Sequence, residues 1–170
     1  STNDEGSNIV DQLSGSTNNF VLAQKDNAAN FVSGFGGFGN NTQLNEAQAI
    51  RVMSEGKLVV EGLPFEKVGT GGTVYIDFNG LSKKGRAVKL GHELTHGTDA
   101  DRGLLDPRSI PINGGFEQRQ EIRAVYRANL IRQQLGVKPL RGQYGTSGPS
   151  LLNAGGQPIN VPPPSLLLRH

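Results

Sequence analysis

The stretch at 91–96 contains residues with the types and the spacing of a metal-dependent hydrolase. His92, Glu93 and His96 form the pattern H-E-x-x-H. On a helix, the two histidines lie one turn apart on the same face, where both imidazoles can reach a single metal ion. Glu93 leaves the helix about 100° from His92, so it flanks the open side of the metal without binding it. There a carboxylate can take a proton from water and deliver it to a leaving amine.

The surroundings of the motif support a metal site. The chain has three histidines, and the one outside the motif is His170. Apolar residues recur around the motif at the spacing of a half-buried helix. They are Ala87, Val88, Leu90 and Leu94. The alternative is a helix whose histidines are only hydrogen-bonded, and we favour Zn²⁺ as a cofactor because the motif is specific and its setting is helical.

Length and composition limit the fold and the partners. The chain has 170 residues and a formal net charge of +2. The length predicts one domain with a real core. The balanced charge argues neither for nor against a nucleic-acid partner, and we expect no such partner. Cysteine is absent, so the metal ligands must be His, Asp or Glu. We expect no membrane span and no signal peptide, because no apolar run has the required length or position.

Changes in composition divide the chain into three parts. Residues 1–19 are polar and are expected to form a linker or flexible arm. Residues 20–145 are expected to form a zincin-like metallopeptidase domain, and residues 146–170, rich in Gly, Ser and Pro, an irregular tail. The glycine-rich stretch at 33–39 lacks the Lys-Ser/Thr ending of a phosphate-binding loop. A flexible loop is therefore expected there.

Apolar periodicity and turn residues predict an α+β fold. In addition to the motif helix, helices are expected over 42–55 and 116–135, and strands over 57–61 and 73–78. Gly97 permits the motif helix to break, and residues 98–115 are expected to be a loop. The predicted fold is zincin-like, with a small antiparallel or mixed sheet packed on the motif helix and on a second long helix.

The strand expected over 73–78 comes directly before the motif helix. Several families of zinc proteases place an edge strand there, and its unpaired backbone groups bind an extended substrate. The strand has one buried face, because apolar residues alternate along it. An ordinary core strand is the alternative interpretation.

The motif supplies two ligands, and a catalytic zinc site needs a third protein ligand besides water. Glu117 and Glu121 both lie near the start of the long helix, and Asp101 is another candidate that would require an irregular turn. Glu121 heads a row of small and apolar residues that would let this helix pack closely on the motif helix. The row consists of Ala124, Ala128, Ile131 and Leu135. We therefore choose Glu121 over the two alternatives.

Four stretches of the sequence together resemble a known family. They are 90–96, which contains the motif, and then 121–126, 129–132 and 140–144. The chain resembles the NleD-like effector metallopeptidases over residues 70–145. These zinc proteases occur as injected (type III) bacterial effectors and as C-terminal toxin modules of Rhs-type polymorphic toxins. Many families share H-E-x-x-H, so the specificity of the resemblance comes from the downstream pattern E…N-x-x-R…R-x-x-Y.

The resemblance implies a site and a setting. It implies Glu121 as the third ligand, with Arg141 and Tyr144 near the active site. The family has Glu-Asn where this chain has Ala128-Asn129, so the role of Asn129 stays open. A secreted or translocated toxin is implied, acting as a virulence factor on a protein in the cytoplasm of a host or rival cell. Its partners would include a cognate immunity protein or the delivery apparatus.

The predicted function is zinc-dependent peptide hydrolysis. His92, His96 and Glu121 would hold Zn²⁺ as in a gluzincin, and Glu93 would activate water. The oxyanion of the transition state needs a further electrophile, for which Tyr144 is the catalytic candidate.

Two other functions remain open. The first is a zinc-stabilised, non-enzymatic binding module, in which Asp99 or Asp101 would close the site as a fourth ligand. Arg119, Arg123 and Arg127 repeat at intervals of four on the long helix, and this arginine ridge could bind an acidic partner or form a solvated face. The second is a zinc hydrolase of cell-wall peptide.

Overall fold

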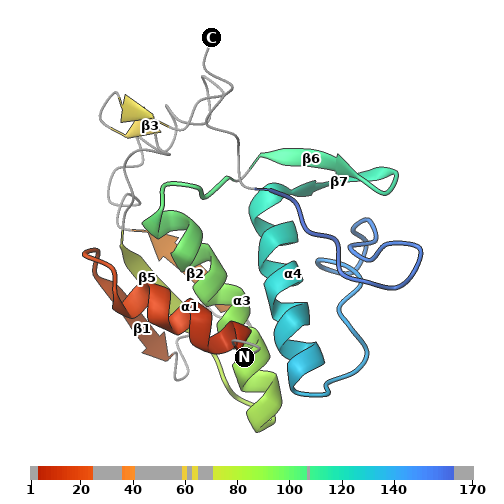
Figure 1. The fold of residues 1–170 in the computed structure, drawn as a ribbon, viewed down its shortest axis with the longest axis horizontal. Coiled ribbons are helices and arrows are strands. Elements are labelled where there is room, and N and C mark those ends of the chain that lie inside the picture. The colour runs from red at the N-terminus through yellow and green to blue at the C-terminus, as the bar shows by residue number, and fades with distance from the viewer. Residues whose placement is uncertain are drawn as a thin grey trace.

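The structure is a computed structural model. It describes residues 4–24, 36–40, 59–60, 63–64, 71–106 and 108–162. Within these ranges the fold mixes α and β, with three helices, a three-stranded sheet and two smaller strand pairs (Figure 1). The predicted mixture of helices and strands is confirmed. The helix expected over 42–55 lies outside the described residues.

Helix α3 (Lys83–Asp101) carries the H-E-x-x-H motif and is the element around which the others pack. Ser82 caps its start, because the side-chain hydroxyl accepts the backbone N–H of Gly85 at 3.1 Å. The helix contacts α1, α4, β2 and β5, and Figure 1 shows it between the sheet and α4. The motif therefore lies in the most enclosed helix among the described residues.

Helix α3 continues past the point where a break was expected. Gly97 lies inside the helix, and a Cβ atom there would contact Leu13 at 3.5 Å and Phe20 at 3.7 Å. Packing outweighs the cost of about 1 kcal/mol that a glycine brings to a helix. The chain leaves the helix instead at Gly103, whose φ of 65° suits the residue after a helix end. The loop predicted over 98–115 is thus wrong for its first residues.

Helix α1 (Glu5–Ser14) corrects the prediction of a linker or flexible arm over 1–19. Asp4 caps the helix by accepting the backbone N–H of its second residue at 2.9 Å. Ile9 is 0% exposed in a core cluster, and Leu13 packs against the same cluster. These two apolar residues lie four apart on one face, so a mostly polar segment still docks firmly.

Helix α4 (Arg119–Gln134) is the second long helix that the sequence predicted. It ends as expected at Gly136, whose φ is 64°. It runs antiparallel to α3, since Lys84 donates to the carbonyl of Leu135 and Arg123 pairs with Asp99.

Among the described residues, no helix has both the length and the apolar character needed to cross a membrane.

The main sheet has the order β1-β5-β2. The strands are β1 (Phe20–Gln24), β2 (Gly36–Asn40) and β5 (Gly72–Ile76). Strand β5 is parallel to β1 and antiparallel to β2, so both of its edges are hydrogen-bonded. The strand before the motif helix is therefore a core strand, with Val74 and Ile76 buried. Strand β2 also corrects the flexible loop expected over 33–39, because part of that stretch is a strand.

The part of the chain that the structure describes also contains two small antiparallel strand pairs. Strands β3 (Val59–Val60) and β4 (Leu63–Pro64) form one pair, and β6 (Ser109–Ile112) and β7 (Gly115–Gln118) form the other. The β6–β7 hairpin replaces the last part of the predicted loop, whereas residues 102–106 form no helix or strand, as expected. Its two-residue turn is Asn113-Gly114, with φ of 45° and 78°, which matches the strand twist.

The described part of the segment after α4, which ends at residue 162, is irregular as expected but packed. Leu151 is buried against Ile122 and Val125 of α4. This second core cluster also holds partly buried residues of the β6–β7 hairpin. Helix α4 is therefore covered on one side by α3 and on another by this segment (Figure 1).

Candidate metal centre

Helices α3 and α4 approach each other closely beside the motif. Gly91 directly precedes the first histidine, and a Cβ atom there would lie 2.2 Å from Cδ1 of Ile131. On the side of α4, Ala128 packs in a core cluster with Val88 of α3, and Ala124 is also buried. The small residues of α4 were predicted from the sequence. Gly91 was missed, although a glycine next to the motif is a signal of close packing.

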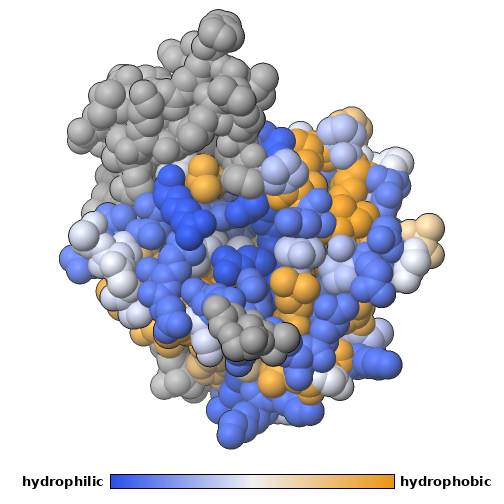
Figure 2. Space-filling view, in the orientation of Figure 1, coloured by the Kyte–Doolittle hydropathy of each residue, from blue (hydrophilic) through white to orange (hydrophobic). Residues whose placement is uncertain are grey.

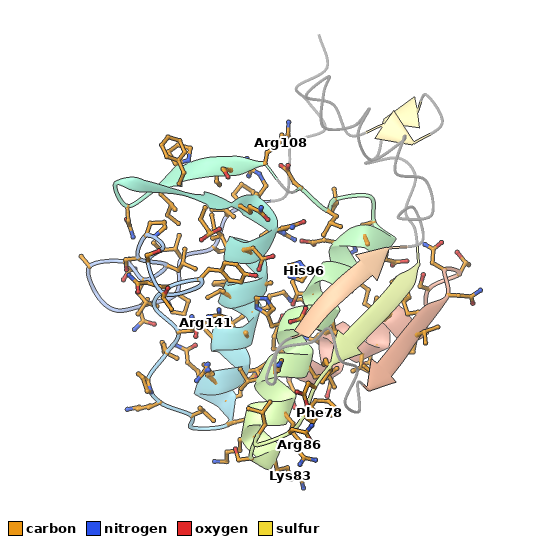
Figure 3. The ribbon with its side chains drawn as sticks, turned by 180° about the vertical axis from the view of Figure 1, so that it is seen from behind. Phe78, Lys83, Arg86, His96, Arg108 and Arg141 are labelled. Atoms are coloured by element: carbon orange, nitrogen blue, oxygen red, sulfur yellow. The ribbon has the colours of Figure 1, made fainter. Side chains whose placement is uncertain are left out.

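The three predicted ligands come together between the two helices. Nε2 of His92 lies 3.3 Å from Oε2 of Glu121, and Nε2 of His96 lies 3.5 Å from Oε1 of the same carboxylate. All three side chains are buried, and His96 projects from α3 toward α4 (Figure 3). This buried group could hold a metal ion, because the three ligand atoms lie within 4.8 Å of one another.

The distances within the group fit a metal ion better than direct hydrogen bonds. At 3.3 and 3.5 Å, the nitrogen–oxygen separations exceed the usual 2.7–3.2 Å of an N–H···O bond. In a tetrahedral site with metal–ligand distances of about 2.0–2.1 Å, neighbouring ligand atoms lie about 3.3–3.4 Å apart. Oε2 of Glu121 is also buried with no hydrogen-bond partner among the described residues. The residues therefore fit a metal.

The charge states of the ligands follow from burial and from their mutual contacts. Burial alone would raise the pKa of Glu121, but the contacts with both histidines outweigh it and keep this pKa well below its usual range. Burial lowers the pKa of His92, which favours the neutral imidazole that binds metals. Burial acts on His96 in the same direction, but its contact with Glu121 prevails and raises the pKa.

Glu93 lies next to the ligand group without belonging to it. It is buried on α3, one residue after the first histidine. Burial, reinforced by the nearby Glu121, raises the pKa of Glu93 to about 7, although His96, Lys89 and Arg141 act in the opposite direction. Its position on the helix is the one predicted for the residue that activates water.

Tyr144 lies beside the ligand group, in the loop after α4. Its ring is stacked parallel to that of His92, with 6.1 Å between centroids and 7° between planes. The guanidinium of Arg141 lies over the same ring, 5.1 Å from the centroid. Burial and the carboxylates of Glu121 and Glu93 raise the pKa of Tyr144 to about 12, so the phenol is a hydrogen-bond donor at neutral pH. At 36% exposure, Tyr144 remains accessible.

The alternative ligands are engaged elsewhere. Asp99 pairs with Arg123 through two bonds of 2.7 Å. Asp101 accepts from the hydroxyl of Ser16 and from the amide of Asn18. Glu117 accepts the backbone N–H of the next residue at 2.8 Å. None of these carboxylates belongs to the metal-binding group found among the described residues.

The arginine ridge is also engaged inside the molecule. Its three arginines pair with carboxylates from three different segments. The pairs are Arg119–Asp106 (3.0 Å), Arg123–Asp99 (2.7 Å) and Arg127–Glu5. The ridge is thus neither a solvated face nor a free surface for an acidic partner.

The face of the molecule that carries α1 is mainly hydrophilic over α1 and α3, and apolar residues gather toward the β6–β7 hairpin (Figure 2).

No family model, curated protein or solved structure compared with this chain matches it. The interpretation of the site therefore depends on its own geometry and chemistry.

Proposed function

We propose that this chain is a zinc-dependent endopeptidase. The observation that carries the proposal is the buried group in which two histidines of one helix face separate oxygens of Glu121. Two imidazoles and one carboxylate are the ligands of a class of catalytic zinc sites that leave one position for water or substrate. A closed structural site would need a fourth protein ligand, and Asp99 and Asp101 bind other partners.

We further propose that the fold is zincin-like. This proposal is supported by a motif helix packed on a small mixed sheet and by a following helix that supplies the third ligand, as in gluzincins. Of the two interpretations of the strand before the motif helix, the core strand agrees with the structure, since β5 is central and is flanked by β1 and β2.

The residues around the group suit peptide hydrolysis. When bound, zinc acts as a Lewis acid that brings the pKa of water toward neutrality. Glu93 accepts the proton of the attacking water and returns it to the leaving amine. The phenol of Tyr144 donates a hydrogen bond to the oxyanion that forms at the scissile carbonyl.

The proposed setting is that of a secreted or translocated bacterial effector or toxin related to the NleD-like metallopeptidases. Its support is the sequence pattern at 121–144, whose Arg141 and Tyr144 lie beside the ligand group. The substrate class would be a protein of a host or rival cell, cleaved in the cytoplasm of the target. An immunity protein or the delivery apparatus would be its partner.

The proposal is tested by metal analysis and protease assays on the wild type and on Glu93→Gln. We expect about one zinc per chain in both proteins, since the substituted residue is not a ligand. Turnover of unfolded and native proteins should fall by about 10²- to 10⁴-fold in the variant. A chain that cannot be loaded with zinc would overturn the proposal. Cleavage of cell-wall peptides but not of proteins would favour the cell-wall hydrolase.

A further inference from the structure

Asn129 is a fully buried polar residue of α4, with 0% exposure. Its side-chain amide makes two hydrogen bonds to the backbone of a single residue. Nδ2 donates to the carbonyl of Arg141 at 3.0 Å, and Oδ1 accepts the N–H of Arg141 at 2.8 Å. Asn129 thus satisfies both backbone groups of Arg141, as an adjacent strand would do in a sheet.

The residue that Asn129 holds begins the loop that carries Tyr144. The guanidinium of Arg141 lies over the ring of Tyr144, and its Nε donates to the carbonyl of Gln143 at 3.0 Å. The ring of Tyr144 is in turn stacked on the ligand His92. A continuous set of contacts therefore runs from α4 through Arg141, which lies beside α4 in Figure 3, to the metal group on α3.

Core packing alone does not explain an asparagine at this position. Asparagine is a poor residue for a helix interior, and burying an unbonded amide is unfavourable. The amide is explained by the two bonds that it makes, and those bonds fix the loop after α4 relative to the helix that supplies Glu121.

We propose that Asn129 is a positioning residue that holds Tyr144 against the metal group through the backbone of Arg141. The catalytic consequence of this role rests on the proposed function, whereas the position of the loop does not. The test therefore has one readout of structure and one of activity.

The structural readout uses Asn129→Leu, which removes both bonds while keeping a similar volume, and Asn129→Ala in case leucine is not accommodated. The proteins are compared by hydrogen exchange and by NMR, both as purified and after the addition of zinc. We expect the amide of Arg141 to exchange about tenfold faster or more, because it loses its acceptor. The NMR contact between the rings of Tyr144 and His92 should weaken, with the amides of α3 and α4 still protected.

Asn153→Ala is the matched control. The side chain of Asn153 also makes two hydrogen bonds to the backbone, to the N–H groups of Gly155 and Gln157, both at 2.9 Å. It lies in an exposed turn of the C-terminal segment. This variant should change neither the exchange of the Arg141 amide nor the contact between Tyr144 and His92.

The activity readout compares Asn129→Leu, Tyr144→Phe and the double variant. We expect kcat to fall about 10- to 100-fold in the first, because a displaced group loses catalysis, and about 100-fold in the second. The double variant should be no slower than Tyr144→Phe alone, and zinc affinity should stay within about twofold. A merely structural role of Asn129 would instead give multiplying losses or weaker zinc binding.

Two results would overturn the proposal. One is an unchanged contact between Tyr144 and His92 in a folded Asn129 variant whose Arg141 amide has lost protection. The other is losses in kcat that multiply in the double variant. A wild-type protein without protease activity would count against the proposed function only, since the exchange and NMR results would still decide whether Asn129 positions the loop.

Discussion

Two rows of residues on helix α4 carry charged side chains, and these side chains have different kinds of partner. One row holds Glu121, which faces two histidines at the contact with α3. The other row is the arginine ridge, whose members end in ion pairs with carboxylates from the rest of the chain. Buried charges are either paired within the protein or bind an ion. The ridge is paired by aspartate and glutamate, whereas Glu121 faces two histidines in a group that could hold a metal ion.

The same comparison explains why helical spacing alone does not reveal function. In both rows the residues recur at intervals that suit one face of a helix. What separates them is the partner on the facing element, and that partner depends on the fold. The following substitutions test the separation between a metal-binding row and a stabilising row.

Glu121→Ala should have the largest effect. The variant loses one of three ligands. Replacing a residue that only hydrogen-bonds to a ligand typically lowers metal affinity about 10- to 100-fold, so zinc affinity should fall by more than this. Activity should be lost with the metal. Stability should change less, because an alanine fits a contact already built from small residues. Calorimetric zinc titration measures the affinity. Glu117→Ala is the control and should bind zinc like the wild type; a reversal between the two would contradict the ligand assignment.

Arg123→Ala should show the opposite profile. It leaves Asp99, which is 2% exposed, without its charge partner, and such a loss costs about 3–5 kcal/mol in the free energy of unfolding. The folded protein should keep its zinc affinity. Urea unfolding monitors the loss. Replacing the pair together, with Arg123→Met and Asp99→Leu, should restore much of the stability; a double variant as unstable as the single one would argue against the ion pair.

Gly91→Ala should have the smallest effect, and its sign should depend on Ile131. The added Cβ would lie 2.2 Å from Cδ1 of Ile131 but 3.7 Å from Cγ1. Alanine is more favourable than glycine in a helix by about 1 kcal/mol, and the cost of displacing Ile131 offsets this gain. In an Ile131→Val background the obstructing atom is gone, and the same change should be stabilising. Thermal unfolding of the wild type, the two single variants and the double variant should give a coupling of about 1–2 kcal/mol in the free energy of unfolding. Additive effects would mean that Gly91 does not set the helix spacing.

The residues of the candidate metal centre could be predicted because their geometry is mostly local. The spacing of His92 and His96 is fixed by the period of a single helix, and Glu121 was selected by the small residues that follow it on the next helix. The role of Asn129 could not be predicted, because its partner is a backbone group in a later loop. No side-chain pattern in the sequence encodes such a contact.

The errors concern pairing between distant segments. The central place of β5 depends on strands β1 and β2, which pair with it on opposite sides and come from an earlier part of the chain. Helix α1 was hidden by its polar composition, although Ile9 and Leu13 mark one apolar face. The β6–β7 hairpin had a local signal, since Asn113-Gly114 is a strong turn sequence that was overlooked among the other glycines.

The central claim is that His92, His96 and Glu121 bind one zinc ion together. Anomalous diffraction at the zinc edge, on crystals of the zinc-loaded protein, tests it most directly. We predict a single strong peak between the two Nε2 atoms and the carboxylate, about 2.0–2.2 Å from each ligand atom. A peak elsewhere in the chain, or a peak at the histidines with Glu121 turned away from it, would contradict the account.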